Sequence, residues 1–152
     1  MTMPSLNRPD LLRDSCMVGG DWITADDRST ISVSNPATGQ IVARVPRMGA
    51  AETARAIAAA ESAGTVWVAR TGKERAAILR RWFEMMRDNR NDLGAILTAE
   101  QGKPWDEAKG EIDYAASFIE WFGEEAKGSG QNLGVRLPFV RQPIAHRGQQ
   151  LL

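Results

Sequence analysis

The sequence predicts a mostly helical chain with a few short strands near its amino terminus. Two patterns lead to this fold class. Apolar and polar residues alternate between turn-forming residues over positions 16–45, and from position 50 onward alanines and larger apolar residues recur every three or four positions. The first pattern is typical of half-buried strands, and the second of helices that bury one side. Helix is therefore expected to exceed strand.

The amino-terminal strands are expected to form two hairpins. Residues 1–15 precede them as a flexible leader, because proline, asparagine and aspartate recur there. Gly19-Gly20 between two apolar stretches predicts a tight turn, since glycine tolerates the positive φ that such turns require. A second pair of strands is expected over 30–45, and its turn is the Asn-Pro-Ala-Thr-Gly stretch at 35–39.

Two helices are expected to follow Pro46. The first is rich in alanine, the best helix former, and is predicted to run from Ala50 to Ala63 and end at Gly64. The second is predicted to start with a capping box at Thr71-Gly72-Lys73-Glu74. We expect it to bury two neighbouring rows of apolar side chains, namely Ile78, Trp82 and Met85, and Leu79, Phe83 and Met86.

Two further helices are expected, and the last is the clearest. A short helix should reach Gln101 and end at Gly102, and Pro104 is well suited to open the next one. The last helix carries an apolar stripe at steps of three and four, namely Ala108, Ile112, Ala115, Ile119, Phe122 and Ala126. Burial of each large member would contribute about 1.5–3 kcal/mol, which requires a partner surface. One more strand is expected over 134–140.

The composition excludes several classes of function. Lys+Arg and Asp+Glu are both 19, so no net charge favours nucleic acid or an anionic membrane as partner. No apolar run is long enough to span a bilayer, and the first residues lack the apolar core of a signal peptide. The single cysteine, Cys16, cannot form an internal disulfide. We therefore expect a cytoplasmic protein.

No complete active site is visible in the residues. Cys16 could be a nucleophile, but no basic partner is near in sequence, and an inert strand residue is the better interpretation. His146 has no neighbouring ligand, so no metal site is expected. The glycines at 128–134 have the wrong spacing and follow a helix, which favours a linker over a dinucleotide site. Five carboxylates are better interpreted as the solvated or partner-facing side of the last helix than as catalytic pairs: Glu107, Glu111, Glu120, Glu124 and Glu125.

Several motifs in order resemble the aldehyde dehydrogenase superfamily, and most closely its succinate-semialdehyde dehydrogenases. The stretches at 100–104, 107–111 and 114–122 read Glu-Gln-Gly-Lys-Pro, Glu-Ala-Lys-Gly-Glu and Tyr-Ala-Ala-Ser-Phe-Ile-Glu-Trp-Phe. Gly-Gly-Asp-Trp at 19–22, the turn at 35–39 and the helix from Lys73 to Phe83 are upstream matches. The resemblance covers residues 16–128, as the amino-terminal strands and helices of such an enzyme.

The resemblance implies an α/β parent enzyme that oxidises a small aldehyde through a cysteine thiohemiacetal and passes hydride to NAD or NADP. The family's nucleophile, catalytic glutamate, oxyanion-hole asparagine and cofactor residues lie downstream of the matched region. No catalytic and no cofactor-binding residue of this chain matches them, and Cys16 and Glu100 are not their counterparts. Gly110 and Tyr114 match a helix that lines the family's substrate tunnel, although core or interface packing is the favoured interpretation of Tyr114.

The end of the sequence departs from the family. Val140 to Ile144 still resembles a family strand, whereas Ala145 to Leu152 does not, so residues 129–152 are read as a divergent tail of a truncated or frame-disrupted gene product. The resulting expectation is an inactive chain that binds no cofactor. The alternative is a non-catalytic module that docks on a full-length homologue or forms a homo-oligomer, and an inert relic is a third possibility. Whether the parent uses NAD or NADP does not follow from these residues.

Overall fold

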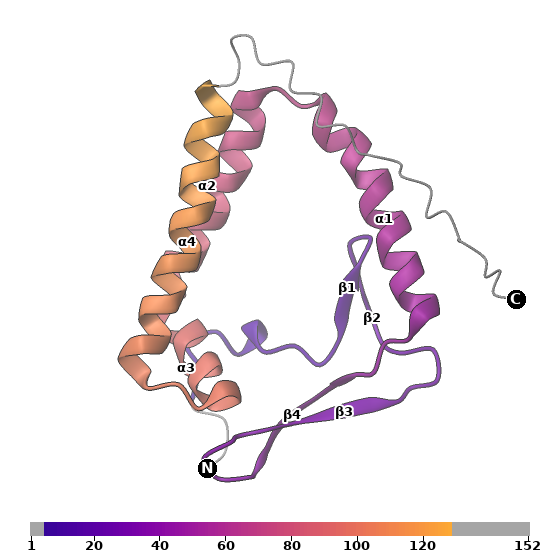
Figure 1. Cartoon of the computed structure of the whole chain (residues 1–152), viewed down its shortest axis with the longest axis vertical. Coiled ribbons are helices and arrows are strands. Elements are labelled where there is room, and N and C mark those ends of the chain that lie inside the picture. The colour runs from indigo at the N-terminus through magenta and orange to yellow at the C-terminus, as the bar shows by residue number, and fades with distance from the viewer. Residues whose placement is uncertain (1–4, 129–152) are drawn as a thin grey trace, which may run out of the picture.

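The computed structural model describes residues 5–128 (Figure 1). Strands and a short helix occupy the first part of the chain and four helices the second. In order, the elements are the 3-10 helix η1 (Pro9–Leu11), β1 (Cys16–Val18), β2 (Asp21–Ile23), β3 (Thr30–Ser34), β4 (Ile41–Pro46), α1 (Ala50–Ala69), α2 (Gly72–Asp88), α3 (Arg90–Gln101) and α4 (Trp105–Gly128). The mostly helical fold with short amino-terminal strands is confirmed.

Both expected hairpins are present as separate two-stranded antiparallel sheets. In the first, Val18 pairs with Asp21 across the turn, and the two turn glycines have φ values of +64° and +98°. In the second, Ile31 pairs with Val45, and the register shifts between Val33 and Ser34. Glycine is required at the first turn because both positions lie in the left-handed region.

The turn between β3 and β4 is held by Asn35. Its side-chain Oδ1 accepts from the amide of Ala37 at 2.9 Å, and its carbonyl accepts from the amide of Gly39 at 2.7 Å. Gly39 has a φ of +70°. The asparagine therefore fixes the turn from both its side chain and its main chain, as the sequence indicated.

Helix α1 is longer than expected. Gly64 does not end it, and the helix continues to Ala69 before Arg70 adopts an extended conformation. A glycine costs only about 1 kcal/mol inside a helix. The five residues after Gly64 bring no proline and no polar turn former, so the helix has no local reason to stop there. The predicted end at Gly64 was wrong.

Helices α2 and α4 pack antiparallel at close range (Figure 1). A Cβ added at Gly72, in the first turn of α2, would lie 2.2 Å from the carbonyl oxygen of Ala126 near the end of α4. Further along the pair, Gly123 lies against Leu79. Small residues thus set the distance between these two helices.

The predicted apolar stripe of α4 was partly wrong. The fully buried positions are the small residues Ala108, Ala116 and Gly123, whereas Phe122 is exposed. Large side chains dominate a hydrophobic pattern, but close helix packing selects small ones at the contact line. The buried side of α4 is therefore rotated away from the stripe that the sequence suggested.

The two apolar rows of α2 also differ in burial. The row of Leu79, Phe83 and Met86 is half-buried. The other row, comprising Ile78, Trp82 and Met85, is exposed within residues 5–128, so its predicted burial was wrong for this structure. The capping box at Thr71 is confirmed, because its hydroxyl accepts from the amide of Glu74 and the Glu74 carboxylate accepts from the Thr71 amide.

Helix α3 ends as predicted, at Gly102 with a φ of +75°. A Cβ at Gly102 would lie 2.8 Å from the ring of Pro36, so the end of α3 touches the β3–β4 turn. At its other end, Asp92 accepts hydrogen bonds from the main chain of Asn7 and Arg8. The leader is thus in contact with α3 at these residues, while its boundary at residue 15 stays a prediction.

No large side chain in the described range is fully buried. Apart from Pro46, the buried apolar side chains are all alanines: Ala25, Ala76, Ala95, Ala99, Ala108 and Ala116. All five tryptophans are between 37% and 63% exposed. Within this range no helix is long and apolar enough to cross a membrane. The helices therefore pack pairwise through small residues, and most of their large apolar surface faces outward.

Candidate functional site

Gly110 and Tyr114 lie one turn apart on the outer side of α4. The space beside the Cα atom of Gly110 is open, since a Cβ added there would meet no atom within 4 Å. Tyr114 is 66% exposed, and its ring stands edge-on against Phe118 at a centroid distance of 4.9 Å. The structure thus brings the two sequence-predicted residues to one accessible surface.

Exposed aromatic side chains continue this surface along α4. Phe118 and Trp121 follow Tyr114 at helical spacing, and both are exposed. We call Tyr114, Phe118 and Trp121 the aromatic face of α4. An open glycine beside an aromatic row leaves room for another chain segment or a small apolar molecule to approach the backbone.

Ion pairs on other sides of α4 fix its position on α2 and α3. Asp113 accepts from Nε of Arg90 at 2.7 Å, and Arg80 Nη1 lies 3.2 Å from Glu120. The hydrogen bond from Arg90 lowers the pKa of Asp113, and the nearby charge of Arg87 lowers it further. Asp113 directly precedes Tyr114, so these contacts hold the turn that presents the tyrosine.

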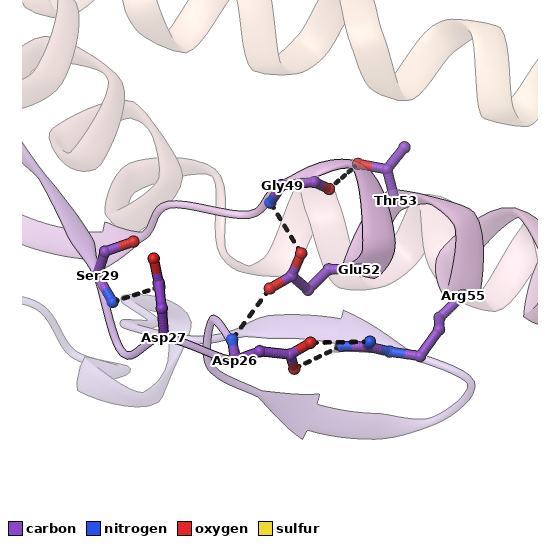
Figure 2. A network of polar contacts seen from close by, with 7 residues as sticks. All are labelled: Asp26, Asp27, Ser29, Gly49, Glu52, Thr53 and Arg55. Carbon is purple, nitrogen blue, oxygen red and sulfur yellow. Dashed lines mark hydrogen bonds and ion pairs between the residues drawn. The ribbon is translucent and has the colours of Figure 1, made fainter.

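A polar network surrounds the start of α1 (Figure 2). The carboxylate of Glu52 accepts from the amides of Asp26 and Gly49, both at 3.0 Å. Asp26 in turn receives two hydrogen bonds from the guanidinium of Arg55, at 3.0 and 2.7 Å. The amide hydrogen bonds, chiefly that from Asp26, lower the pKa of Glu52.

The network borders a shallow polar depression of about 250 Å³. It is lined by Asp27, Ser29, Arg47, Met48, Gly49 and Glu52. The amide and hydroxyl of Ser29 lower the pKa of Asp27. Each of the two lining carboxylates, Asp27 and Glu52, therefore already accepts a hydrogen bond from the protein. The bond from the Asp26 amide to Glu52 links the β2–β3 loop to the start of α1. The sequence analysis missed this role, although Gly-x-x-Glu at 49–52 is the spacing of a glutamate that caps a helix start.

The other candidate residues are not assembled into a site. Cys16 is half-buried in β1. Three of the five glutamates on α4 form ion pairs, Glu111 with Lys103, Glu120 with Arg80 and Glu124 with Lys127. Residues 5–128 contain no group of three side chains suited to hold a metal ion. His146, the expected strand at 134–140, most of the glycine-rich stretch at 128–134 and the tail at 129–152 lie outside the described residues.

Comparison with known proteins identifies the family. Residues 22–145 match the family model described as "Aldehyde dehydrogenase family". The chain is 52% identical over 145 residues to a glutarate-semialdehyde dehydrogenase of Pseudomonas putida and 48% identical over 145 residues to the NADP(+) succinate-semialdehyde dehydrogenase of Escherichia coli. Each alignment covers 91% of this chain and 30% of the relative.

Solved structures give the same result. An aldehyde dehydrogenase from Brucella melitensis superimposes with a TM-score of 0.81 at 51% identity, over 83% of this chain and 26% of that one. A succinate-semialdehyde dehydrogenase from Burkholderia pseudomallei gives 0.78 at 59% identity, over 80% and 25%. The chain belongs to the aldehyde dehydrogenase family, and it spans about 30% of the length of these curated relatives. The similar enzymes include glutarate- and succinate-semialdehyde dehydrogenases.

The described residues do not form a dinucleotide site. Such a site needs a strand followed by a glycine-rich turn and a helix, in a parallel sheet. Residues 5–128 contain only antiparallel hairpins, and α1 follows β4 through Arg47, Met48 and Gly49 without that motif. The start of α1 is moreover taken by the Glu52 carboxylate. These residues therefore lack the backbone arrangement that binds the pyrophosphate of NAD or NADP.

Proposed function

We propose that residues 16–128 are the amino-terminal part of an NAD(P)-dependent aldehyde dehydrogenase for a small aldehyde that also carries one acidic group. The reference reaction is oxidation of succinate semialdehyde to succinate. The names of the similar enzymes support this substrate class, since they include glutarate- and succinate-semialdehyde dehydrogenases and a 3-sulfolactaldehyde dehydrogenase. The name of the Escherichia coli relative, which includes NADP(+), supports NAD(P) as hydride acceptor of the whole enzyme.

The aromatic face of α4 is the observation that carries the proposal. Tyr114, Phe118 and Trp121 expose large apolar surface on a helix whose other sides pack on α2 and α3. Contiguous exposed apolar surface of this kind marks a place where another surface packs or a ligand binds. In the proposed enzyme, the catalytic and cofactor domains cover most of this side, and Gly110 and Tyr114 remain at the path of the aldehyde.

The chain's own contribution is thus positional. The chemistry needs a nucleophile, a base and a bound hydride acceptor, and none of the residues 5–128 supplies them in a common site. We expect the purified 152-residue chain to produce no NAD(P)H from succinate or glutarate semialdehyde. NAD(P)H formed above the rate without protein would overturn this expectation.

A chimera tests the proposed role directly. Residues 16–128 would replace the corresponding segment of the 52% identical Pseudomonas putida enzyme. We expect an active glutarate-semialdehyde dehydrogenase, because the segment carries the same packing surfaces. A chimera that is soluble and folded but inactive, or one that fails to fold, would count against the proposal.

Variants of the chimera test the role of Tyr114. Tyr114→Ala should raise KM for the aldehyde more than it changes kcat or KM for the cofactor. Phe122→Ala is the matched control, since it removes an aromatic ring with similar exposure from the same helix. Equal effects of the two variants on KM would remove Tyr114 from the substrate path.

A docking module is the second candidate function, and the same exposed surface favours it. The α2–α4 pair would then bind a full-length homologue in place of that protein's own helices, without turnover. Co-purification of the tagged chain with the coexpressed Pseudomonas putida enzyme would support it. Loss of that association in Trp121→Ser, with retention in the exposed Trp67→Ser of α1, would assign the contact to α4.

A further inference from the structure

Residues 5–12 lie against α3, and we call them the amino-terminal strap. Within residues 5–128, every hydrogen bond from the strap to the rest of the chain ends on the carboxylate of Asp92. The amide of Asn7 donates to Oδ1 at 3.1 Å and its side-chain Nδ2 donates to the same oxygen at 3.2 Å. The amide of Arg8 donates to Oδ2 at 2.7 Å. One carboxylate thus receives three donors from a segment 84–85 residues away in sequence.

The strap has internal contacts that preset its shape. The guanidinium of Arg8 binds both carboxylate oxygens of Asp10, at 2.8 and 2.7 Å. The amide of Leu12 donates to the carbonyl of Pro9, closing the short helix η1. Because the Arg8 side chain is engaged with Asp10, the neighbouring main-chain amides of Asn7 and Arg8 are the groups that face α3.

Asp92 is placed to hold such donors. It is the third residue of α3, where the helix dipole favours a negative charge, and it is only 6% exposed. Within the described chain, no other residue donates a side-chain hydrogen bond to it or forms an ion pair with it. A buried carboxylate without partners is costly, so the strap and Asp92 stabilise each other.

The strap lies between two parts of the fold: the β1–β2 hairpin with α1 on one side, and α3 with the α2–α4 pair on the other. Figure 1 shows its indigo trace passing from α3 toward β1. The β1–β2 hairpin contacts α1, with Gly19 near Ala59, and α3 packs on α4. Helix α1 diverges from α2 and α4 at the link that follows Ala69. On the opposite side, the strap and the β3–β4 hairpin, whose turn touches Gly102, both run between α1 and the other helices (Figure 1).

We infer that Asp92 is a latch: it holds the strap to α3 and, together with the contact of the β3–β4 turn with Gly102, sets the separation of α1 from the α2–α4 pair. Asp92→Asn replaces one of the two acceptor oxygens by an NH2 group, which is itself a donor. When this group faces the Arg8 amide, the hydrogen bond from Arg8 is lost. The strap then detaches from α3, and the β1–β2 hairpin and α1 gain freedom relative to α4. This inference concerns the chain's own conformation and does not depend on the proposed enzymatic role.

Hydrogen exchange of the full 152-residue chain tests the latch. In Asp92→Asn, the amides of Asn7 and Arg8 should exchange at least about tenfold faster, because the loss of a charge-assisted hydrogen bond favours local opening. Asp88→Asn is the matched control, as this exposed carboxylate makes no ion pair or side-chain hydrogen bond within residues 5–128. Equal exchange in both variants and the parent would overturn the latch.

A distance measurement tests the coupling between the two halves. Spin labels at Ala58→Cys on α1 and Ser117→Cys on α4, in a Cys16→Ser background, should give a broader distance distribution with Asp92→Asn than with Asp88→Asn. Faster strap exchange with an unchanged distribution would overturn the coupling. If Asp92→Asn also lowers the protection of amides from exchange throughout α4, Asn7→Pro is the variant to use in its place. Asn7→Pro removes two of the three donors and leaves α3 intact. Strap exchange unchanged in Asn7→Pro would then refute the latch.

Discussion

The contact between Gly72 and Ala126 predicts that Gly72→Ala destabilises the chain. Its new Cβ would lie 2.2 Å from a backbone oxygen, and it must move beyond 3.0 Å before the contact becomes tolerable. Because that oxygen belongs to α4, the two helix ends must separate. Overpacking of this kind costs about 1–3 kcal/mol. The better helix propensity of alanine offsets at most about 1 kcal/mol, and less in the first turn.

Gly64→Ala is the control with the opposite sign. It lies inside α1, and an added Cβ would meet nothing within 4 Å. The substitution should therefore stabilise by about 0.5–1 kcal/mol. Thermal unfolding followed by circular dichroism should give Tm about 2–8 °C lower for Gly72→Ala and about 1–4 °C higher for Gly64→Ala. A Gly72→Ala variant as stable as Gly64→Ala would refute the close packing of α2 on α4.

Three further predictions concern single polar contacts. Thr71→Ala should lower the free energy of unfolding by about 1 kcal/mol, measured by urea titration, because an amide of α2 loses its cap. The pKa of Glu52 is lowered in the folded chain, so its contribution to stability is present above the ordinary carboxyl pKa and is lost as pH falls through the folded value. Glu52→Gln should therefore lower Tm at pH 7 and flatten the fall of Tm below pH 5. The control Glu61→Gln, at an exposed position, should do neither. The hydrogen bond from Arg8 lowers the pKa of Asp10 to about 2, and an NMR titration should show it return toward its ordinary value in Arg8→Ala.

Local signals in the sequence predicted the elements of this fold well. Turn glycines, the Asn35 turn, the Thr71 capping box and the Gly102 stop each act within a few residues, so their physics is contained in the local sequence. Gly64 shows the limit of this reasoning. A glycine is compatible with both the middle and the end of a helix, and only the residues that follow decide between them.

Packing was predicted less well, because it depends on which surfaces meet. Hydrophobic periodicity weights large side chains, so it selected Phe122 and the Trp82 row for burial. The contact between α2 and α4 instead uses Gly72, Ala76 and Gly123, whose value lies in their small size. No periodicity measure identifies such residues without knowledge of the partner helix.

The candidate site depended on resemblance more than on physics. Gly110 and Tyr114 were named because they match a family helix, and their common exposed position was not deducible from the sequence alone. Glu52 was within reach of sequence reasoning through its spacing from Gly49, but its second partner is the amide of Asp26. That contact joins a loop to a helix 26 residues away, and only the folded chain reveals it.

Tryptophan fluorescence offers the most direct test of whether the exposed apolar surfaces of α2 and α4 bind a partner or a second copy. All five are at least 37% exposed in the described chain, which is unusual for a residue that buries so much apolar area when it can. In dilute solution, we expect red-shifted emission and ready quenching by acrylamide. If the α2–α4 surface binds a partner or a second copy, quenching should fall as the protein or partner concentration rises, and Trp82→Phe or Trp121→Phe should remove most of that change. Trp22→Phe should not remove it, because Trp22 lies on the β1–β2 hairpin beneath Arg13. Blue-shifted, quencher-resistant emission at the lowest concentrations would instead mean that the isolated chain closes around its own core and that its helix faces need no partner.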